Sequence, residues 1–223
     1  MKLRLDREVI AMRIAKELRD GEVVNLGIGL PTLVANYLPP DKTMILHSEN
    51  GVYGFGQVLM EGEEHLIDYN LTNAGGQFIS SAPGMCFTDY GDAFDAVHVG
   101  RVSTSVLGAY QVSEKGDLAN WTKEPEGYWG SIGGAMDMVM AKRIIVGMEH
   151  TTRNNKSRIV KRCSYAITGR ECVDLIVSDL AVIEVTGGGL LLREVAPGWT
   201  VEEVQALTEP KLRVDERLKE IEL

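Results

Sequence analysis

The sequence is poor in the residues that build disulfide frameworks and metal sites. It has an odd number of cysteines, no Cys-x-x-Cys pair, and histidines with no ligand spacing on a common helix face. The cysteines and histidines are Cys86, Cys163, Cys172, His47, His65, His98 and His150. We therefore expect no structural disulfide and no metal site.

Long apolar runs and excess positive charge are also missing. No run approaches the roughly 18 residues that a membrane span needs. The first six residues lead directly into a helix pattern and lack the apolar stretch of a signal peptide. The net charge is −9 and the isoelectric point is about 5.0. We expect a cytoplasmic protein that binds neither membranes nor nucleic acid.

Three common glycine motifs are incomplete or absent. Gly27-Ile28-Gly29 follows an expected strand, but Thr32 stands where a dinucleotide-binding fingerprint has its third glycine. No glycine loop is followed by Gly-Lys-Ser/Thr, which excludes a P-loop. No Gly-x-Ser-x-Gly is present, which argues against a serine hydrolase.

What is present is the pattern of an α/β protein. The chain has 223 residues, of which 44% are hydrophobic and 25% charged, as in ordinary globular proteins. Asp6 is a candidate N-cap for a helix reaching about residue 20, and Gly21 would end it. A short helix is expected over residues 32–38, and a capping box, Thr200 to Glu203, opens another. Strands are expected over residues 23–26, 43–47, 96–99, 105–110, 143–147, 175–177 and 181–185, and a hairpin turn at 187–189. We predict one domain, residues 1–223, with an open, largely parallel sheet flanked by helices.

One carboxylate stands at the end of an expected strand. Glu49 follows an apolar approach and precedes Asn50-Gly51, the pair that most readily adopts positive φ. Loops at such strand ends surround the crevice in which α/β proteins bind ligands. The alternative is a surface hairpin with a solvated glutamate.

Two further segments favour an anionic ligand. Gly133-Gly134 opens a helix-like run, and glycines there let backbone N–H groups approach an anion or oxyanion. Between residues 142 and 170, eight basic residues and one acidic residue give a net charge of +7, so the rest of the chain has a net charge of −16. This stretch could hold a phosphate-bearing ligand. The alternatives are a plain turn with a helix start and a solvated basic face.

Several separated motifs together resemble the family I CoA-transferases. They are Ser48-Glu49-Asn50-Gly51, Gly133-Gly134-Ala135-Met136-Asp137 and Met148-Glu149-His150. The chain is similar to the β (B) subunit of 3-oxoacid and acetoacetate CoA-transferases. The similarity covers nearly the whole chain and includes residues 25–31, 116–121, 163–174 and 197–201.

The resemblance implies that Glu49 is the catalytic nucleophile. Its carboxylate would attack an acyl-CoA thioester, and a glutamyl-CoA thioester would follow in a ping-pong reaction. The donor would be succinyl-, acetyl- or butyryl-CoA, and the acceptor a 3-oxo acid such as acetoacetate, with 3-oxoadipate also fitting. Coenzyme A is then a substrate, and no permanently bound cofactor or metal is implied.

The same resemblance assigns roles around Glu49. The Gly133 and Gly134 amides would stabilise the oxyanion, where one donor is typically worth about 3 kcal/mol. The Gly27-Ile28-Gly29 loop would be a second wall or donor toward CoA, and Asn50 and Gly51 would shape the site. With an ordinary pKa near 4.3, Glu49 would be ionised at pH 7 and need no general base.

The family also implies a partner. An α (A) subunit of similar fold would complete the site, in an α2β2 assembly that acts on acyl-CoA and a short-chain carboxylic acid. Two alternatives remain: an acyl-CoA hydrolase on the same scaffold, and a non-catalytic relative. Gln77 and residues 78–87 are candidates for the acyl pocket, but nothing in the sequence fixes them there.

Overall fold

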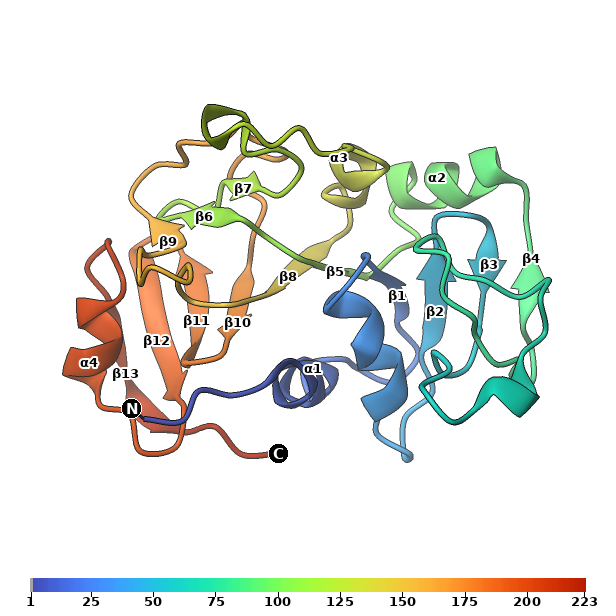
Figure 1. The fold of residues 1–223 in the computed structure, drawn as a ribbon, viewed down its shortest axis with the longest axis horizontal. Coiled ribbons are helices and arrows are strands. Elements are labelled where there is room, and N and C mark those ends of the chain that lie inside the picture. The colour runs from blue at the N-terminus through green and yellow to red at the C-terminus, as the bar shows by residue number, and fades with distance from the viewer. Residues whose placement is uncertain (1) are drawn as a thin grey trace.

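A computed structural model describes residues 2–223, which form an open ten-stranded sheet with helices around it (Figure 1). Within these residues the α-helices are α1 (Arg7–Ala15), α2 (Tyr90–His98), α3 (Ala135–Met138) and α4 (Val201–Ala206). The strands are β1 (Val23–Leu26), β2 (Ile45–Ser48), β3 (Val52–Tyr53), β4 (Cys86–Phe87), β5 (Thr104–Leu107), β6 (Gln111–Ser113), β7 (Leu118–Ala119), β8 (Arg143–Met148), β9 (Ile159–Val160), β10 (Leu175–Ser178), β11 (Ala181–Thr186), β12 (Gly189–Val195) and β13 (Arg213–Glu220). Short 3₁₀ helices cover Pro31–Tyr37, Glu64–Leu66 and Glu124–Glu126. None of the helices in residues 2–223 has the length and apolar character needed to cross a bilayer.

The centre of the large sheet is parallel, as predicted. The strand order is β13-β12-β11-β10-β8-β5-β1-β2-β3-β4. Strands β10, β8, β5, β1 and β2 all run in one direction, while β11, β3 and β4 pair antiparallel with their neighbours. Because parallel strands end at one edge, the segments that follow β1, β2, β5 and β8 come together there. The α/β prediction is therefore confirmed.

The first βαβ-like unit also forms as predicted. Strands β1 and β2 are parallel, and the connection between them contains the 3₁₀ helix Pro31–Tyr37. Proline at the first position suits a helix start, because its missing N–H has no partner there anyway. The Thr32 hydroxyl donates to the Gly29 carbonyl at 2.7 Å and closes the preceding turn.

Helix α1 begins where predicted and ends early. The Asp6 side chain accepts a hydrogen bond from the Val9 N–H at 2.9 Å, so Asp6 is the N-cap. The helix ends at Ala15 rather than near residue 20. Beyond it, the N–H groups of Glu17 and Leu18 bond three residues back, which tightens the last turn. Leu18 stays buried through this turn.

The strand predicted over residues 96–99 is wrong, because most of this segment lies in helix α2. Asp89 caps the helix by accepting from the Gly91 N–H at 2.8 Å. Ala93 and Val97, four residues apart, are the buried positions. A run as short as 96–99 has too few apolar residues for its periodicity to separate strand from helix, and the cap seven residues upstream decides it.

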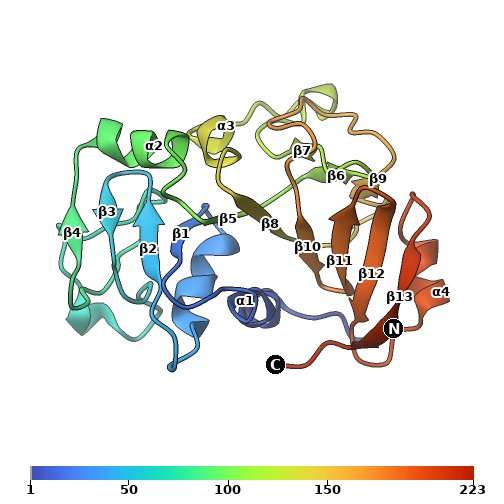
Figure 2. The same cartoon turned by 180° about the vertical axis from the view of Figure 1, so that it is seen from behind.

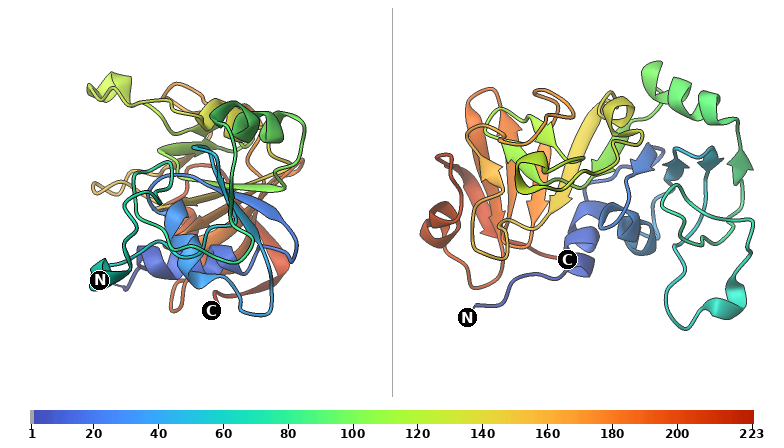
Figure 3. Two further views of the ribbon diagram at one scale, coloured as in Figure 1. Left: turned by 90° about the vertical axis from the view of Figure 1, so that its right-hand side faces the viewer. Right: turned by 45° about the horizontal axis from the view of Figure 1, so that its top comes forward.

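A small second sheet, β7-β6-β9, in the described part of the chain was not predicted. Strand β5 ends at Leu107, and the chain then leaves the large sheet to form β6. Figure 1 shows α2, α3 and this small sheet along the upper side, while α1 lies below. Figure 2 shows the N-terminal segment beside β13 and α4, where Lys2 pairs with Glu203. In Figure 3, α2 (green) and α3 (yellow) again lie close together.

Candidate active site

Glu49 lies in the turn of a β-hairpin. It follows β2 directly, and β2 pairs antiparallel with β3. Gly51 has φ of +95°, and its N–H donates to the Ser48 carbonyl at 3.0 Å. A Cβ at Gly51 would collide with the Thr88 carbonyl. Glycine is therefore required here both because the backbone of Thr88 packs closely and because φ is positive. Asn50 is exposed, and its amide donates to the Thr72 carbonyl at 2.8 Å. Both residues shape the turn.

The turn opens onto a cavity at the carboxyl ends of the parallel strands. The cavity has a volume of about 440 Å³. Of the residues singled out from the sequence, Glu49, Gly27, Ile28, Gly29, Gly133 and Gly134 all line it. Asn50 and Gly51 complete the turn but do not line the cavity. Segments far from Glu49 in sequence, on both sides of it, thus meet around one carboxylate.

Of the two glycines, Gly134 leaves less room beside the Glu49 carboxylate. Its backbone N–H faces the Glu49 carboxylate and lowers the pKa of that group. A Cβ at Gly134 would collide with Glu49 Oε2 and would lie 2.8 Å from two ring carbons of Phe94. At Gly133, whose φ is +50°, a Cβ would lie 3.8 Å from Glu49 Oε1, an ordinary contact. The close packing thus requires glycine at 134 and leaves room at 133.

The surroundings raise the pKa of Glu49. Burial is the main cause, the nearby Gly134 N–H opposes it, and the charge of Asp137 adds to it. The expectation of an ordinary glutamate pKa was therefore wrong. Burial disfavours the charged form, so the ionised carboxylate is more basic than that of a solvated glutamate.

The loop Gly27-Ile28-Gly29 is a wall of the cavity. The Gly27 N–H donates to the Val106 carbonyl at 2.9 Å, which leaves it unable to donate to a ligand. A Cβ at Gly27 would lie 3.1 Å from the same oxygen. Of the two roles proposed for the loop, wall or donor, the position of Gly27 fits the wall.

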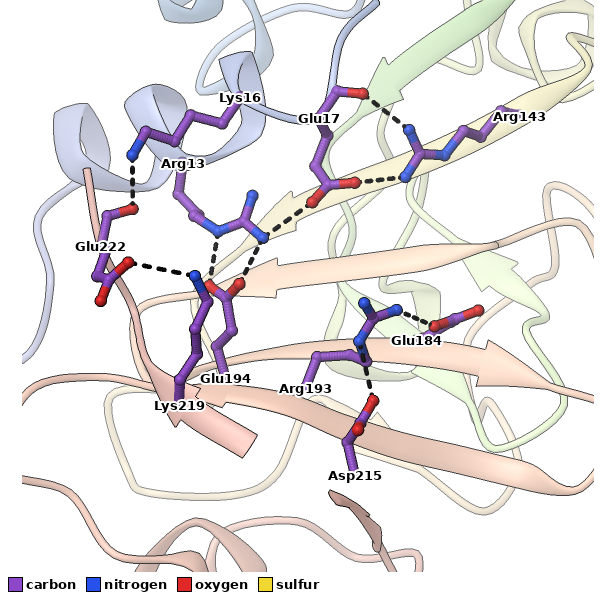
Figure 4. Close-up of polar contacts among 10 residues, drawn as sticks. All are labelled: Arg13, Lys16, Glu17, Arg143, Glu184, Arg193, Glu194, Asp215, Lys219 and Glu222. Atoms are coloured by element: carbon purple, nitrogen blue, oxygen red, sulfur yellow. Dashed lines mark hydrogen bonds and ion pairs between the residues drawn. The ribbon is translucent and has the colours of Figure 1, made fainter. Parts of the chain in front are cut away.

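Most of the basic stretch lies away from this cavity. Arg158 lines it and pairs with Glu149 at 3.1 Å. Arg143, the first residue of β8, lies at the opposite end of the strands, where it pairs with Glu17 at 2.6 Å (Figure 4). Arg143 therefore belongs to a network of ion pairs at the far end of the strands from Arg158, and a phosphate-binding role for the 142–170 stretch stays a prediction.

Several lining residues were not singled out from the sequence as site residues. Among them are Arg7, Asn25, Tyr110, Asn120 and Lys123. They come from separate segments, and only the fold brings them to one surface. Within residues 2–223, no group of three or more His, Cys, Asp or Glu side chains is placed to hold a metal ion.

Known proteins share both the sequence and the fold. A family model described as coenzyme A transferase matches residues 7–207. The sequence is 43% identical over 206 residues to the B subunit of the 3-oxoadipate CoA-transferase of Acinetobacter baylyi, covering 92% of this chain and 94% of that protein. It is 42% identical over 216 residues to the mitochondrial succinyl-CoA:3-ketoacid coenzyme A transferase 2B of Mus musculus, covering 96% of this chain and 41% of that protein. The acyl-CoA transferase YdiF apoenzyme of Escherichia coli O157:H7 shares the fold, with a TM-score of 0.74 at 21% identity over 100% of this chain and 44% of that chain.

Proposed function

This chain belongs to the coenzyme A transferase family as a β subunit, and on that basis we propose that it supplies the nucleophile of a 3-oxoacid CoA-transferase. The nucleophile is Glu49. The observation that carries the proposal is the half-buried Glu49 carboxylate, which lines a cavity and packs against the backbone of Gly134. A nucleophile beside a fixed backbone donor is the arrangement that acyl transfer needs.

The reaction takes place in two half-reactions. The Glu49 carboxylate attacks the acyl-CoA carbonyl, a C–O bond forms, the C–S bond breaks, and CoA leaves as thiolate. The thiolate then attacks the glutamyl carbonyl of the mixed anhydride, which gives a glutamyl-CoA thioester and releases the donor acid. In the second half-reaction, the acceptor carboxylate attacks the glutamyl-CoA thioester, which gives a new mixed anhydride and releases CoA thiolate. The thiolate then attacks the acyl carbonyl of that anhydride, which releases the new acyl-CoA and frees the Glu49 carboxylate.

The Gly134 N–H is the proposed oxyanion donor for these tetrahedral intermediates. A preorganised donor of this kind is typically worth about 3 kcal/mol of transition-state stabilisation. Burial gives Glu49 a raised pKa, so its carboxylate is a stronger nucleophile than a solvated one once it is ionised. The partly enclosed site also limits access of water to the anhydride and thioester.

The proposed substrates are short-chain. The donor is succinyl-, acetyl- or butyryl-CoA, and the acceptor is a 3-oxo acid, either acetoacetate or 3-oxoadipate. Support comes from the relatives, whose names specify 3-oxoadipate in one case and succinyl-CoA with a 3-ketoacid in the other. Because one thioester replaces another, no ATP is required.

An A subunit is the proposed partner, in an α2β2 assembly. Relatives that match over nearly their whole length are named as B subunits, which implies a companion A subunit. The mouse relative is more than twice as long as the matched part, as expected where both halves share one chain.

The test is a transfer assay on the co-purified complex of this chain with its A subunit. Succinyl-, acetyl- and butyryl-CoA are each combined with acetoacetate or 3-oxoadipate, and the new acyl-CoA is quantified by chromatography. We expect formation of a new acyl-CoA that requires the acid and is lost in Glu49→Ala. Release of CoA at the same rate without the acid would instead identify a hydrolase. No turnover with any pair would indicate a non-catalytic relative.

A further inference from the structure

A chain of buried polar side chains crosses the parallel sheet beside the proposed nucleophile. Ser105 Oγ donates to Asn25 Oδ1 at 3.0 Å, and Asn25 Nδ2 donates to His47 Nδ1 at 3.0 Å. The exposed fractions are 0% for Ser105, 2% for Asn25 and 0% for His47. These residues lie on β5, β1 and β2, and His47 precedes Glu49 by two positions. Polar groups so deeply buried are kept only where their hydrogen bonds are made.

The partners of His47 specify one neutral tautomer. Nδ1 accepts from the Asn25 amide, so the ring proton is on Nε2, which donates to the Ala93 carbonyl at 3.1 Å. Burial lowers the pKa of His47, which agrees with a neutral ring. The Tyr53 ring packs edge-on against the imidazole, with centroids 4.8 Å apart. His47 is thereby held on several sides.

The Ala93 carbonyl belongs to helix α2, and other residues of α2 contact the segment that contains Gly134. The next residue, Phe94, has the ring that leaves no room for a Cβ at Gly134. At the end of α2, His98 Nε2 lies 2.7 Å from Asp137 Oδ1 on α3, the short helix that Gly134 caps. Helix α2 therefore touches the strand that leads to Glu49 on one side and the segment that carries the Gly134 N–H on the other.

We infer that His47 is a positioning residue, which ties strand β2 to helix α2 and so holds the Glu49 carboxylate against the Gly134 N–H. The inference rests on the proposed function, because it concerns the alignment of nucleophile and oxyanion donor. His47 is fully buried and does not line the cavity; it acts through the backbone of Ala93. A displacement of about 1 Å between reacting groups can cost up to roughly a hundredfold in rate.

Two substitutions separate the two hydrogen bonds of His47. In His47→Asn, Oδ1 takes the place of Nδ1 and keeps the hydrogen bond from Asn25, but the side chain has no donor that reaches the Ala93 carbonyl. In His47→Gln, the amide nitrogen takes the place of Nε2 and keeps the bond to α2. We expect His47→Asn to lower kcat about ten- to hundredfold and His47→Gln to stay within about threefold of wild type, with KM for acyl-CoA unchanged in both.

A second measurement does not depend on turnover. Hydrogen exchange of backbone amides, measured in the complex of this chain with its A subunit, reports how often residues 131–138 open locally. We expect faster exchange there in His47→Asn and wild-type exchange in His47→Gln. If the wild-type complex has no transferase activity but this exchange difference is found, the proposed reaction fails while the positioning contact stands. Equal kcat in the two variants, or a slower His47→Asn with unchanged exchange, would overturn the inference.

The exposed end of α2 provides a variant that leaves the core intact. His98 is partly exposed, so His98→Ala is expected to fold even if substitutions at His47 do not. We expect His98→Ala to lower kcat severalfold and to speed exchange over residues 131–138, while His98→Gln, which can still donate to Asp137, restores both. Unchanged kcat and exchange in His98→Ala would contradict a role for α2 in holding the site.

Discussion

Replacing Gly134 by alanine tests the geometry of the site with a single methyl group. The new Cβ would lie 2.8 Å from two carbons of the Phe94 ring and would collide with Glu49 Oε2. Carbon atoms in contact prefer 3.5–4.0 Å, so the backbone and the ring must separate by roughly 0.7–1.2 Å. The same movement carries the Gly134 N–H away from the Glu49 carboxylate. We therefore expect Gly134→Ala to lower kcat by about 10²–10³-fold, the usual effect of losing one oxyanion donor.

Gly133→Ala is the matched control in the adjacent position. There a Cβ would lie 3.8 Å from Glu49 Oε1, which is an ordinary contact. Its φ of +50° is unfavourable for an L-residue by roughly 1–2 kcal/mol, so this variant should lose stability and keep most of its rate.

The assay is a single-turnover measurement of acyl-CoA consumption by the complex, with urea unfolding of each variant beside it. Moving the Gly134 N–H away should also raise the pKa of Glu49 further, because that N–H lowers it. The acid limb of the rate profile should therefore move to higher pH in Gly134→Ala alone. Full rate in Gly134→Ala, or equal loss in both variants, would refute the assignment of Gly134 as the donor.

Three other predictions concern protonation and buried charge. Burial raises the pKa of Glu49, so kcat/KM should fall with decreasing pH in a limb centred above the ordinary value of about 4.3; a limb at or below that value would contradict the burial argument. Burial lowers the pKa of His150 to about 4, so stability to urea should decline as pH falls from about 6.5 toward 4, where only the unfolded chain takes up the proton; His150→Asn should flatten that decline. Arg13→Met leaves Glu194 buried without its partner and should lower the free energy of unfolding by about 3 kcal/mol, while Glu184→Gln, which breaks an exposed pair, should cost less than about 1 kcal/mol in the same urea titration (Figure 4).

Local signals in the sequence predicted local structure well. The Asp6 cap, the capping box at Thr200, strand β1 and the hairpin turn at residues 187–189 are all confirmed. These features depend on a few neighbouring residues, and the side chains that decide them are adjacent in sequence. Helix α2 was missed because its cap, Asp89, lies outside the short run whose periodicity was assessed.

The candidate site was predicted in part, and what was missed depends on tertiary contacts. Glu49, Gly27, Gly133 and Gly134 were singled out from the sequence and meet at one cavity. Their electrostatics could not be predicted, because burial of Glu49 and the nearby Asp137 come from packing. The bond that occupies the Gly27 N–H comes from Val106 on another strand, which no pattern around Gly27 reveals. The catalytic roles of the residues around Glu49 stay predictions until they are tested.

The proposed reaction requires that Glu49 carries CoA covalently. The most direct measurement is intact-mass and peptide mass spectrometry of the complex with its A subunit, after incubation with acetoacetyl-CoA and no acceptor acid. We expect a CoA adduct on the peptide that contains Glu49, absent in Glu49→Ala and removed when acetoacetate or another acceptor acid is added. An adduct on a different residue, or turnover by the wild type that persists in Glu49→Ala, would contradict the account.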